Sequence, residues 1–429
     1  MGYFRSLTST ALLALATIGS GAASAQTTVT MWTFLDPLRT SPREIALKQM
    51  IEGFEKANPS IKIKVEPQDF AQMPPRFFLG HGTGQNPDIV WIDAKNLGGL
   101  IQSGAATDLQ QALVSKWPAG QRDDFFVGAG WDAAKVGNKL HALPLFHGAS
   151  VIYYRKDLLR EAGIDPASLK SWDAIAEAAK KLTKTKDGRV DVWGFGMPLA
   201  PTKTESTPLL IGMIDGGGQL FNGCKANFAT EAGVRGLRYT AEMITQNKST
   251  PQEALAQHVD DITDQFTAGR YAMAITSNLR FSAIARTAAF GGANIGILPW
   301  PTWSGQGTGP MPVSGWWVAM WNKSPRQAEA GKFIEYMTGA EGVKLWSTVG
   351  GQVPTRKSVL AEPVFKEPQN EWIQTMVTAW SARSWIEPTE CNTRTMQAAL
   401  NEAVHRVVLQ NANPMDALKE AERKFNDAQ

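Results

Sequence analysis

Cysteine is scarce in this chain: only two occur among 429 residues, so a disulfide-dense scaffold and a four-cysteine zinc site are both excluded. An excess of one charge is also missing, since 43 Lys and Arg stand against 40 Asp and Glu, giving a formal net charge of +3. Because no run of basic residues forms a stripe, we expect no nucleic-acid partner. Beyond the start of the chain no run reaches about 18 apolar residues, so we expect no membrane-spanning helix.

The familiar signatures of hydrolases and metal enzymes are missing as well. No serine lies in G-x-S-x-G or begins S-x-x-K, and none of the five histidines belongs to H-E-x-x-H. The glycine-rich segments 82–84 and 216–218 complete no nucleotide-binding motif, so we interpret them as turns and expect neither cofactor nor metal. A glycoside hydrolase needs only two carboxylates, so that enzyme class stays open.

What is present is an ordinary globular balance with one compositional oddity. Hydrophobic residues make up 43% of the chain and charged residues 19%, which excludes a mainly disordered protein. The length allows roughly three domain-sized units or two large lobes. Fifteen Trp stand against six Tyr, so broad, flat apolar side chains are unusually frequent.

Residues 1–25 have the composition of a cleavable secretory signal peptide. Met1 and Arg5 supply positive charge, residues 11–18 are apolar, and Ala23-Ser24-Ala25 fits an A-x-A cleavage site. We therefore expect an exported protein that begins at Gln26 and works in the periplasm. In that compartment Cys224 and Cys391 could form a lasting disulfide, and the sequence leaves open whether they are joined.

The next part of the chain alternates between strand and helix patterns. Residues 29–34 alternate apolar and polar side chains, as a strand does. Ser41-Pro42-Arg43-Glu44 then has the chemistry of a helix start, and apolar residues repeat at helical spacing to Phe54. Two further strand patterns follow at 61–65 and 88–93. Strand, helix and strand in this order predict an α/β fold with a largely parallel sheet.

Several segments, in this order and spacing, resemble the sugar-binding family 1 of extracellular solute-binding proteins, which serve bacterial ABC importers and include the maltose-binding proteins. The resembling segments are residues 54–63, 87–90, 141–144, 153–164, 266–273, 296–299 and 315–317. His141 stands where the family more often has a tyrosine.

The resemblance implies two Rossmann-like lobes joined by a hinge, the periplasmic binding protein-like II or Venus-flytrap arrangement. By the family's lobe order, lobe one should contain residues 26–146 and 278–312, and lobe two residues 148–276 and 314–370. The C-terminal helices, residues 371–429, should pack on the lobes. The chain should cross between lobes near 146–149, 276–278 and 311–315.

Ligands of open α/β sheets bind beyond the carboxyl ends of the strands, so residues at these places are our first candidates for the binding site. They are Trp32, Phe34, Asp36, Asp69, Phe70 and Asp93. A sugar suits such a set, because carboxylates accept hydrogen bonds from its hydroxyls and an aromatic ring covers its apolar face. The three acidic candidates favour a neutral ligand.

Two neighbouring tryptophans, Trp316 and Trp317, follow Gly315 in the segment richest in aromatic residues. Successive side chains of a strand face opposite sides, so one of the two rings should be a stacking platform for the ligand. Gly315 should let the backbone approach the ligand closely. The other candidates are His147 at the expected hinge and, from the resemblance, Asn278 and Arg356.

The sequence therefore predicts a non-enzymatic periplasmic substrate-binding protein of an ABC importer. We expect it to bind a sugar, an oligosaccharide or a polyol between its lobes, to act as a monomer, and to deliver the ligand to permease subunits in the inner membrane. The alternatives are a secreted glycoside hydrolase, or the same fold binding a glycerol phosphate or another small anion.

Overall fold

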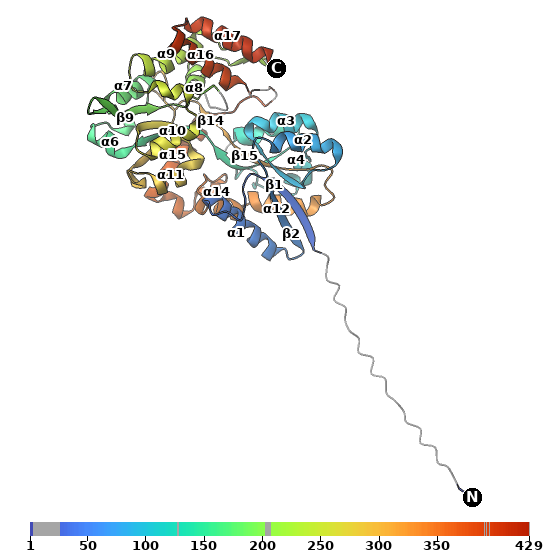
Figure 1. Ribbon diagram of the computed structural model, residues 1–429. Helices are drawn as coiled ribbons and strands as arrows, with labels where there is room; N and C mark the ends of the chain where they lie inside the picture. Colours follow the sequence, from blue (N-terminus) through green and yellow to red (C-terminus); the bar gives the residue numbers. More distant parts are fainter. Residues whose placement is uncertain are drawn as a thin grey trace.

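Two five-stranded sheets form the centres of two α/β lobes that lie side by side in the computed structural model (Figure 1). The structure describes residues 1–2, 26–126, 128–201, 207–389, 391, 393 and 395–428. The expected signal peptide, residues 1–25, falls almost entirely outside this part of the chain. In the described part, no helix is both long and apolar enough to cross a membrane.

The sheet of lobe one has the strand order β2-β1-β3-β15-β6. Its strands are β1 (Thr27–Thr33), β2 (Ile61–Pro67), β3 (Ile89–Asp93), β6 (Leu143–Gly148) and β15 (Ser314–Met320). β1 runs parallel to β2 and β3, whereas β15 runs antiparallel to both β3 and β6. The carboxyl ends of β1, β2, β3 and β6 and the amino end of β15 therefore meet at one edge.

The sheet of lobe two has the strand order β13-β7-β12-β9-β8. Its strands are β7 (Ser150–Arg155), β8 (Lys184–Lys186), β9 (Arg189–Gly196), β12 (Tyr271–Ser277) and β13 (Ile295–Leu298). β7 is antiparallel to β12 and β13, and β12 is parallel to β9. The amino end of β7 and the carboxyl end of β12 lie next to each other, because Ser150 pairs with Ser277.

The strand pairing corrects the expected division of the chain. Residues 278–312 were expected in lobe one, but they contain β13, which belongs to the second sheet. Residues 314–370 were expected in lobe two, but they begin with β15, the strand next to β3 in the first sheet. The two segments thus exchange lobes relative to the prediction.

The chain passes between lobes at two of the three expected places. It leaves lobe one between β6 and β7, at 148–150, and returns between β14 (Met311–Pro312) and β15. The crossing expected near 276–278 is absent from the described chain. There β12 is followed by 3₁₀-helix η5 (Asn278–Arg280), helix α11 (Phe281–Thr287) and β13, and both strands belong to lobe two.

Helix α1 shows how local sequence fixes an element of lobe one. It begins at Pro42 after Ser41, whose backbone N–H donates to the Glu44 carboxylate over 3.1 Å, and its apolar face is buried at Leu47, Met50 and Phe54. The helices that build lobe one are α1 (Pro42–Ala57), α2 (Met73–Thr83), α3 (Leu97–Ser103), α4 (Leu109–Ala112), α5 (Gly128–Asp132), α12 (Gln327–Thr338) and α13 (Ala340–Thr348).

Lobe two carries the remaining helices, including those of the C-terminus. α16 and α17 pack on α9, and their buried side chains join the apolar core of lobe two (Figure 1). The helices are α6 (Lys156–Glu161), α7 (Trp172–Leu182), α8 (Thr207–Asp215), α9 (Glu231–Thr245), α10 (Val259–Thr267), α11 (Phe281–Thr287), α14 (Lys357–Leu360), α15 (Glu371–Arg383), α16 (Met396–Gln410) and α17 (Pro414–Asp427).

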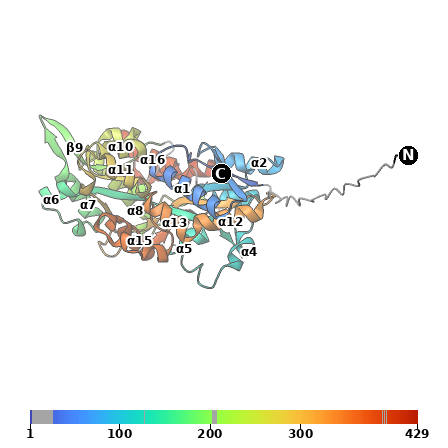
Figure 2. The same ribbon diagram turned by 90° about the horizontal axis from the view of Figure 1, so that it is seen from below.

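The described chain also contains three pairs of two-residue strands. They are β4 (Lys135–Val136) with β5 (Lys139–Leu140), β10 (Phe221–Asn222) with β11 (Lys225–Ala226), and β14 with β16 (Ser384–Trp385). In the view of Figure 2 the two lobes again lie next to each other. Helix α16 lies near the middle of the molecule in this view, and α12 marks lobe one.

A disulfide joins Cys224 to Cys391, with the two Cα atoms 5.3 Å apart. The sequence left open whether these two cysteines are joined, and the structure shows that they are. It links the turn between β10 and β11 to the segment between β16 and α16, so it fixes the C-terminal part of the chain to lobe two.

Candidate ligand-binding site

The edge of the first sheet that faces the crossings brings several predicted site residues together. Phe34 follows β1 and packs on Trp316 of β15, with 4.4 Å between ring centres. Trp316 is in turn the backbone neighbour of Asp93, the last residue of β3. Three of the predicted residues, far apart in sequence, thus gather because strand ends of one sheet meet there.

His147 and Gly315 belong to the paired strands β6 and β15 at the first crossing. The His147 imidazole is 2% exposed and lies 5.8 Å from the Trp317 ring, measured between centres. Burial lowers its pKa to about 4, while a hydrogen bond with the backbone of Ser314 acts in the opposite direction. At neutral pH His147 is therefore uncharged and packs within the hinge.

Gly315 serves the close approach of two strands. Its φ is +116°, and a Cβ there would lie 2.2 Å from the carbonyl oxygen of Phe146 on β6. The backbone of β6 alone thus accounts for glycine at this position, and a ligand contact of Gly315 stays a prediction.

Asn278 fastens the same crossing from the side of lobe two. Its Oδ1 accepts a hydrogen bond from the backbone N–H of Ala149 over 2.7 Å, and its own N–H donates to the Ala149 carbonyl over 3.0 Å. The side chain is fully buried. Asn278 therefore holds the chain that joins the lobes, and its predicted contact with a ligand stays a prediction.

A cavity of about 70 Å³ lies beside this junction and is lined by both lobes; we call it the hinge cavity. Lobe one contributes the residues that follow β3, lobe two the start of β7 and a residue of α8, and the C-terminal region a third wall. The lining residues are Ala94, Lys95, Ser150, Leu210, Pro312, Val313, Ser314, Trp385, Ile386, Glu387 and Gln397.

The C-terminal wall of the hinge cavity combines an aromatic ring with hydrogen-bonding groups. Trp385 is half-buried and is held by its carbonyl, which accepts a hydrogen bond from Val313 N–H over 2.7 Å. The Glu387 carboxylate accepts hydrogen bonds from Gln397 Nε2 (2.9 Å) and Thr393 Oγ1 (2.6 Å). An indole beside a fixed carboxylate and amide can cover an apolar ring face and bind hydroxyl groups.

A second cavity between the lobes has a volume of about 360 Å³ and contains two arginines, Arg43 and Arg280; we call it the arginine cavity. Arg43 comes from the start of α1 in lobe one and Arg280 from the end of η5 in lobe two. Leu279 of this cavity and Ser314 of the hinge cavity both touch Gly148, so the two cavities flank the first crossing.

Two predicted ligand residues have structural roles away from these cavities. Trp317 is fully buried in the core of lobe one, and its Nε1 donates to the Gly130 carbonyl over 2.7 Å, so it is no stacking platform. Arg356 is 3% exposed: its Nε donates to the Thr338 carbonyl and its guanidinium pairs with Asp124 over 3.2 Å. Burial lowers the pKa of Arg356, and Asp124 acts in the opposite direction.

The four other predicted residues make local contacts in lobe one. Trp32 donates from Nε1 to the Glu66 carboxylate over 3.0 Å. Asp36 and Asp69 accept hydrogen bonds from backbone N–H groups two residues further along, as turn residues do. Phe70 is 57% exposed on the surface. None of the four lines the hinge cavity or the arginine cavity.

None of the twelve predicted ligand residues lines the hinge cavity or the arginine cavity, so the sequence prediction missed the residues that do. Lys95 and Ser150 stand one to two residues beyond positions that we did consider, and Arg43 and Arg280 look like ordinary charges at helix ends. Trp385, in the C-terminal region, lies at none of the strand ends from which the candidates were chosen. The excess of tryptophan was the one sequence signal that pointed to it.

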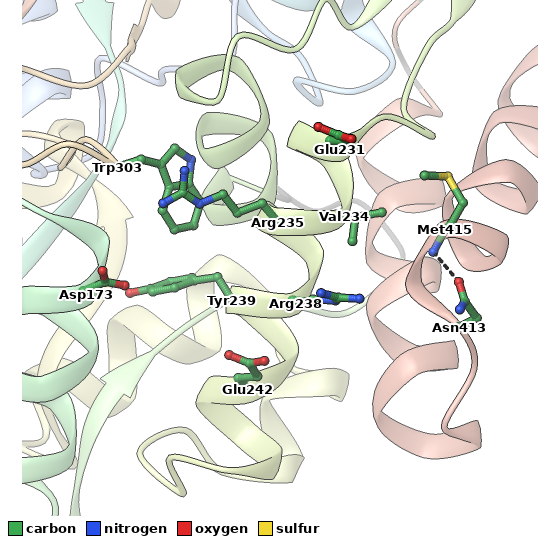
Figure 3. Close-up of a pocket in the computed structure, with 10 residues that line it drawn as sticks. All are labelled: Asp173, Glu231, Val234, Arg235, Arg238, Tyr239, Glu242, Trp303, Asn413 and Met415. Carbon is green, nitrogen blue, oxygen red and sulfur yellow. Dashed lines mark hydrogen bonds between the residues drawn. The ribbon is translucent and has the colours of Figure 1, made fainter.

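A further cavity lies on the outer face of lobe two and is shown in Figure 3. Arg235 of α9 lies over the Trp303 ring there, with its guanidinium carbon 4.0 Å from the ring centre (Figure 3). Arg238 projects from the same helix and is exposed. The walls of this cavity come from α7, α9, the loop of Trp303 and the start of α17, so lobe one contributes no residue to the cavity.

Comparison with known proteins gives a family and a fold. A family model described as bacterial extracellular solute-binding protein matches residues 40–344. The arabinooligosaccharide-binding protein of Bacillus subtilis (strain 168) is 24% identical over 359 residues, which are 81% of this chain and 78% of that protein.

Among solved structures, maltose-bound T. maritima MalE3 superposes with a TM-score of 0.77 at 20% identity, over 94% of this chain and all (100%) of that one. A solute-binding protein from Agrobacterium radiobacter K84 in complex with ribitol gives a TM-score of 0.75 at 19% identity, over 95% and 100% of the two chains. These matches confirm the two-lobed α/β fold that the sequence predicts.

Proposed function

The chain belongs to the bacterial extracellular solute-binding protein family, and from this premise we propose that it holds a sugar, an oligosaccharide or a polyol between its lobes without altering it. The protein acts in the periplasm and delivers its ligand to the permease of an ABC importer. Binding favours a closed arrangement of the lobes, and the permease recognises that arrangement.

One observation carries this proposal: the hinge cavity gathers an indole ring and hydrogen-bonding groups from both lobes and the C-terminal segment. Trp385 offers an apolar face, and the side chains of Glu387 and Gln397 offer polar contacts. A sugar presents apolar C–H faces and a ring of hydroxyls, so its chemistry matches both kinds of contact.

The relatives support the same class of ligand. One of them is named for arabinooligosaccharides, and the two structural neighbours contain maltose and ribitol. These are an oligosaccharide class, a disaccharide and a polyol, which share multiple hydroxyl groups on a short carbon framework.

Hydrolysis of a glycoside is the less favoured function for the hinge cavity. Its chemistry needs two carboxylates on opposite sides of the scissile bond, roughly 5 to 10 Å apart. Within the described chain, Glu387 is the one carboxylate that lines the hinge cavity, and it is engaged by Thr393 and Gln397.

Isothermal titration calorimetry of the exported protein against pentose and hexose oligosaccharides, monosaccharides and polyols tests the proposal. We expect one saturable site per chain for at least one member of this panel. Incubation of the bound sugar with the protein, followed by chromatography, should return it uncleaved. Failure of every member to bind, or release of cleaved products, would contradict the proposal.

A further inference from the structure

The arginine cavity places two positive side chains from opposite lobes into one space. Arg43 extends from the start of α1 in lobe one, and Arg280 ends η5 in lobe two. Hydroxyl groups of Ser41 and Ser282 belong to the same lining. The cavity lies beside the first crossing, and both lobes contribute to its walls.

Charge pairing in this cavity is incomplete. In the described part of the chain, the Arg43 side chain makes no hydrogen bond or ion pair; its guanidinium carbon lies 5.3 Å from the ring centre of Phe34. Arg280 pairs with Asp260, and Asp264 is the one carboxylate in the lining. Glu44, the acidic neighbour of Arg43, instead accepts from the Ser41 backbone.

The two arginines influence each other electrostatically. Burial lowers the pKa of the Arg43 guanidinium, the positive charge of Arg280 lowers it further, and Glu44 acts in the opposite direction. Arg43 and Arg280 belong to different lobes and carry like charges that repel each other. Closure of the lobes without a ligand therefore works against this repulsion. A negative group between them would remove the repulsion and would give the donors of Arg43 an acceptor.

We propose that the natural ligand is an acidic sugar whose negatively charged oxygens are bound jointly by Arg43 and Arg280. This inference rests on the proposed function and narrows its ligand class. A guanidinium presents a planar set of donors that matches two oxygens of a carboxylate or phosphate, and such charged hydrogen bonds are stronger than neutral ones. It departs from our sequence-based expectation of a neutral ligand, which rested on Asp36, Asp69 and Asp93.

The test compares galacturonic acid oligomers with their methyl esters by titration calorimetry of the whole protein. The ester keeps the ring hydroxyls and removes the charge. We expect the acid to bind at least 10-fold more tightly than the ester, and this preference should shrink as sodium chloride is raised from about 50 to 500 mM, because salt screens charge. Galactose 6-phosphate and inorganic phosphate, tested alongside, separate a carboxylate, a sugar phosphate and a free anion.

Variants connect the preference to the cavity. Arg43→Gln and Arg280→Gln should each weaken binding of the acid at least 10-fold and so reduce the preference for the acid over its methyl ester. Arg238→Gln is the matched control, because Arg238 is exposed on the outer face of lobe two and outside the cleft (Figure 3). Circular dichroism confirms that each variant is folded.

The outcomes separate this inference from the proposed function. Tighter binding of the galactose phosphate than of galactose, lost in the two cleft variants, supports the inference with phosphate as the acidic group. Equal affinity for acid and ester with no preference for the sugar phosphate, or neutral sugars binding best, overturns the inference and leaves the proposed function standing. Binding of inorganic phosphate alone, or of no sugar of any kind, overturns both.

Discussion

Two tryptophans, Trp385 and Trp317, differ in how deeply they are buried. Trp385 is half-buried in the wall of the hinge cavity, whereas Trp317 is fully buried and donates to the Gly130 carbonyl. We expect Trp385→Ala to weaken sugar binding about 5-fold, since an aromatic contact contributes on the order of 1 kcal/mol. Its melting temperature should change little, because the ring is only partly buried.

Trp317→Ala is the matched comparison for that variant. It should cost about 3 to 5 kcal/mol of unfolding free energy, as removal of a buried aromatic side chain does. Calorimetric titration and urea unfolding of both variants measure the two effects. Strong destabilisation by Trp385→Ala without loss of affinity would assign Trp385 to packing.

His147 makes stability depend on pH at the hinge. Its pKa is about 4 in the folded chain, against about 6.5 in an unfolded one. Between these values the unfolded chain binds a proton that the folded chain does not, so the free energy of unfolding falls as the pH drops from about 6.5 to 4. For this buried group the total is about 3 kcal/mol.

His147→Gln should remove that part of the pH dependence, because glutamine does not titrate. Urea unfolding of both proteins at pH 7.0, 5.5 and 4.5 checks it, and carboxylates contribute equally to the two curves. Parallel curves for the variant and the parent would mean that His147 takes no part in acid destabilisation.

The segment that follows β16 and precedes α16 supplies part of the wall of the hinge cavity, a role that no pattern in the sequence predicts. It brings Trp385 and Glu387 to the hinge cavity, and Cys391 within it is bonded to Cys224 of lobe two. Replacing both cysteines by serine should lower the unfolding free energy by up to about 5 kcal/mol, the chain-entropy value for a loop of this size. It should also weaken sugar binding, because the wall of the cavity loses its anchor.

Thermal unfolding and titration of this double variant, beside the parent protein treated with a thiol reductant, measure both effects. The reduced parent should resemble the variant. An unchanged affinity in both would show that the segment is positioned by its packing on α15 and β14 alone.

Local elements could be predicted from the sequence better than their partners. The strand after Gln26, the helix start at Ser41 and the strand ending at Asp93 follow from alternation, capping chemistry and apolar runs within a few residues. The lobe to which β13 and β15 belong does not, since either short apolar strand could complete either sheet. That choice is made by pairing with β7 and β3, which lie more than a hundred residues away.

The lining of the two cavities escaped prediction for the same reason. The strand-end rule depends on one sheet, so it selected Phe34 and Asp93, which lie beside Trp316 at one sheet edge but line neither cavity. It missed Trp385, Glu387 and the arginine pair, since these reach the cleft through contacts between lobes and through a two-residue strand that leaves no periodic pattern.

At the scale of the whole molecule, binding of a sugar in the hinge cavity, as proposed above, would require the lobes to move. The cavity's volume of about 70 Å³ is well below the roughly 300 to 1,000 Å³ of typical ligand pockets, so a sugar ring enters only when the lobes separate. The lobes are joined by short crossings at 148–150 and at 312–314 and by the segment between α13 and α14.

We therefore expect the radius of gyration in small-angle X-ray scattering to decrease when ligand saturates the protein. A compact chain of 429 residues has a radius of roughly 22 Å, and the free protein should lie above the ligand-bound one. Trp385→Ala, measured at the same ligand concentration, should show a smaller decrease, because fewer molecules are bound and closed. Superimposable scattering curves from free protein and from protein with calorimetrically verified full occupancy would exclude closure, since the lobes would then keep one arrangement whether or not a ligand lies between them.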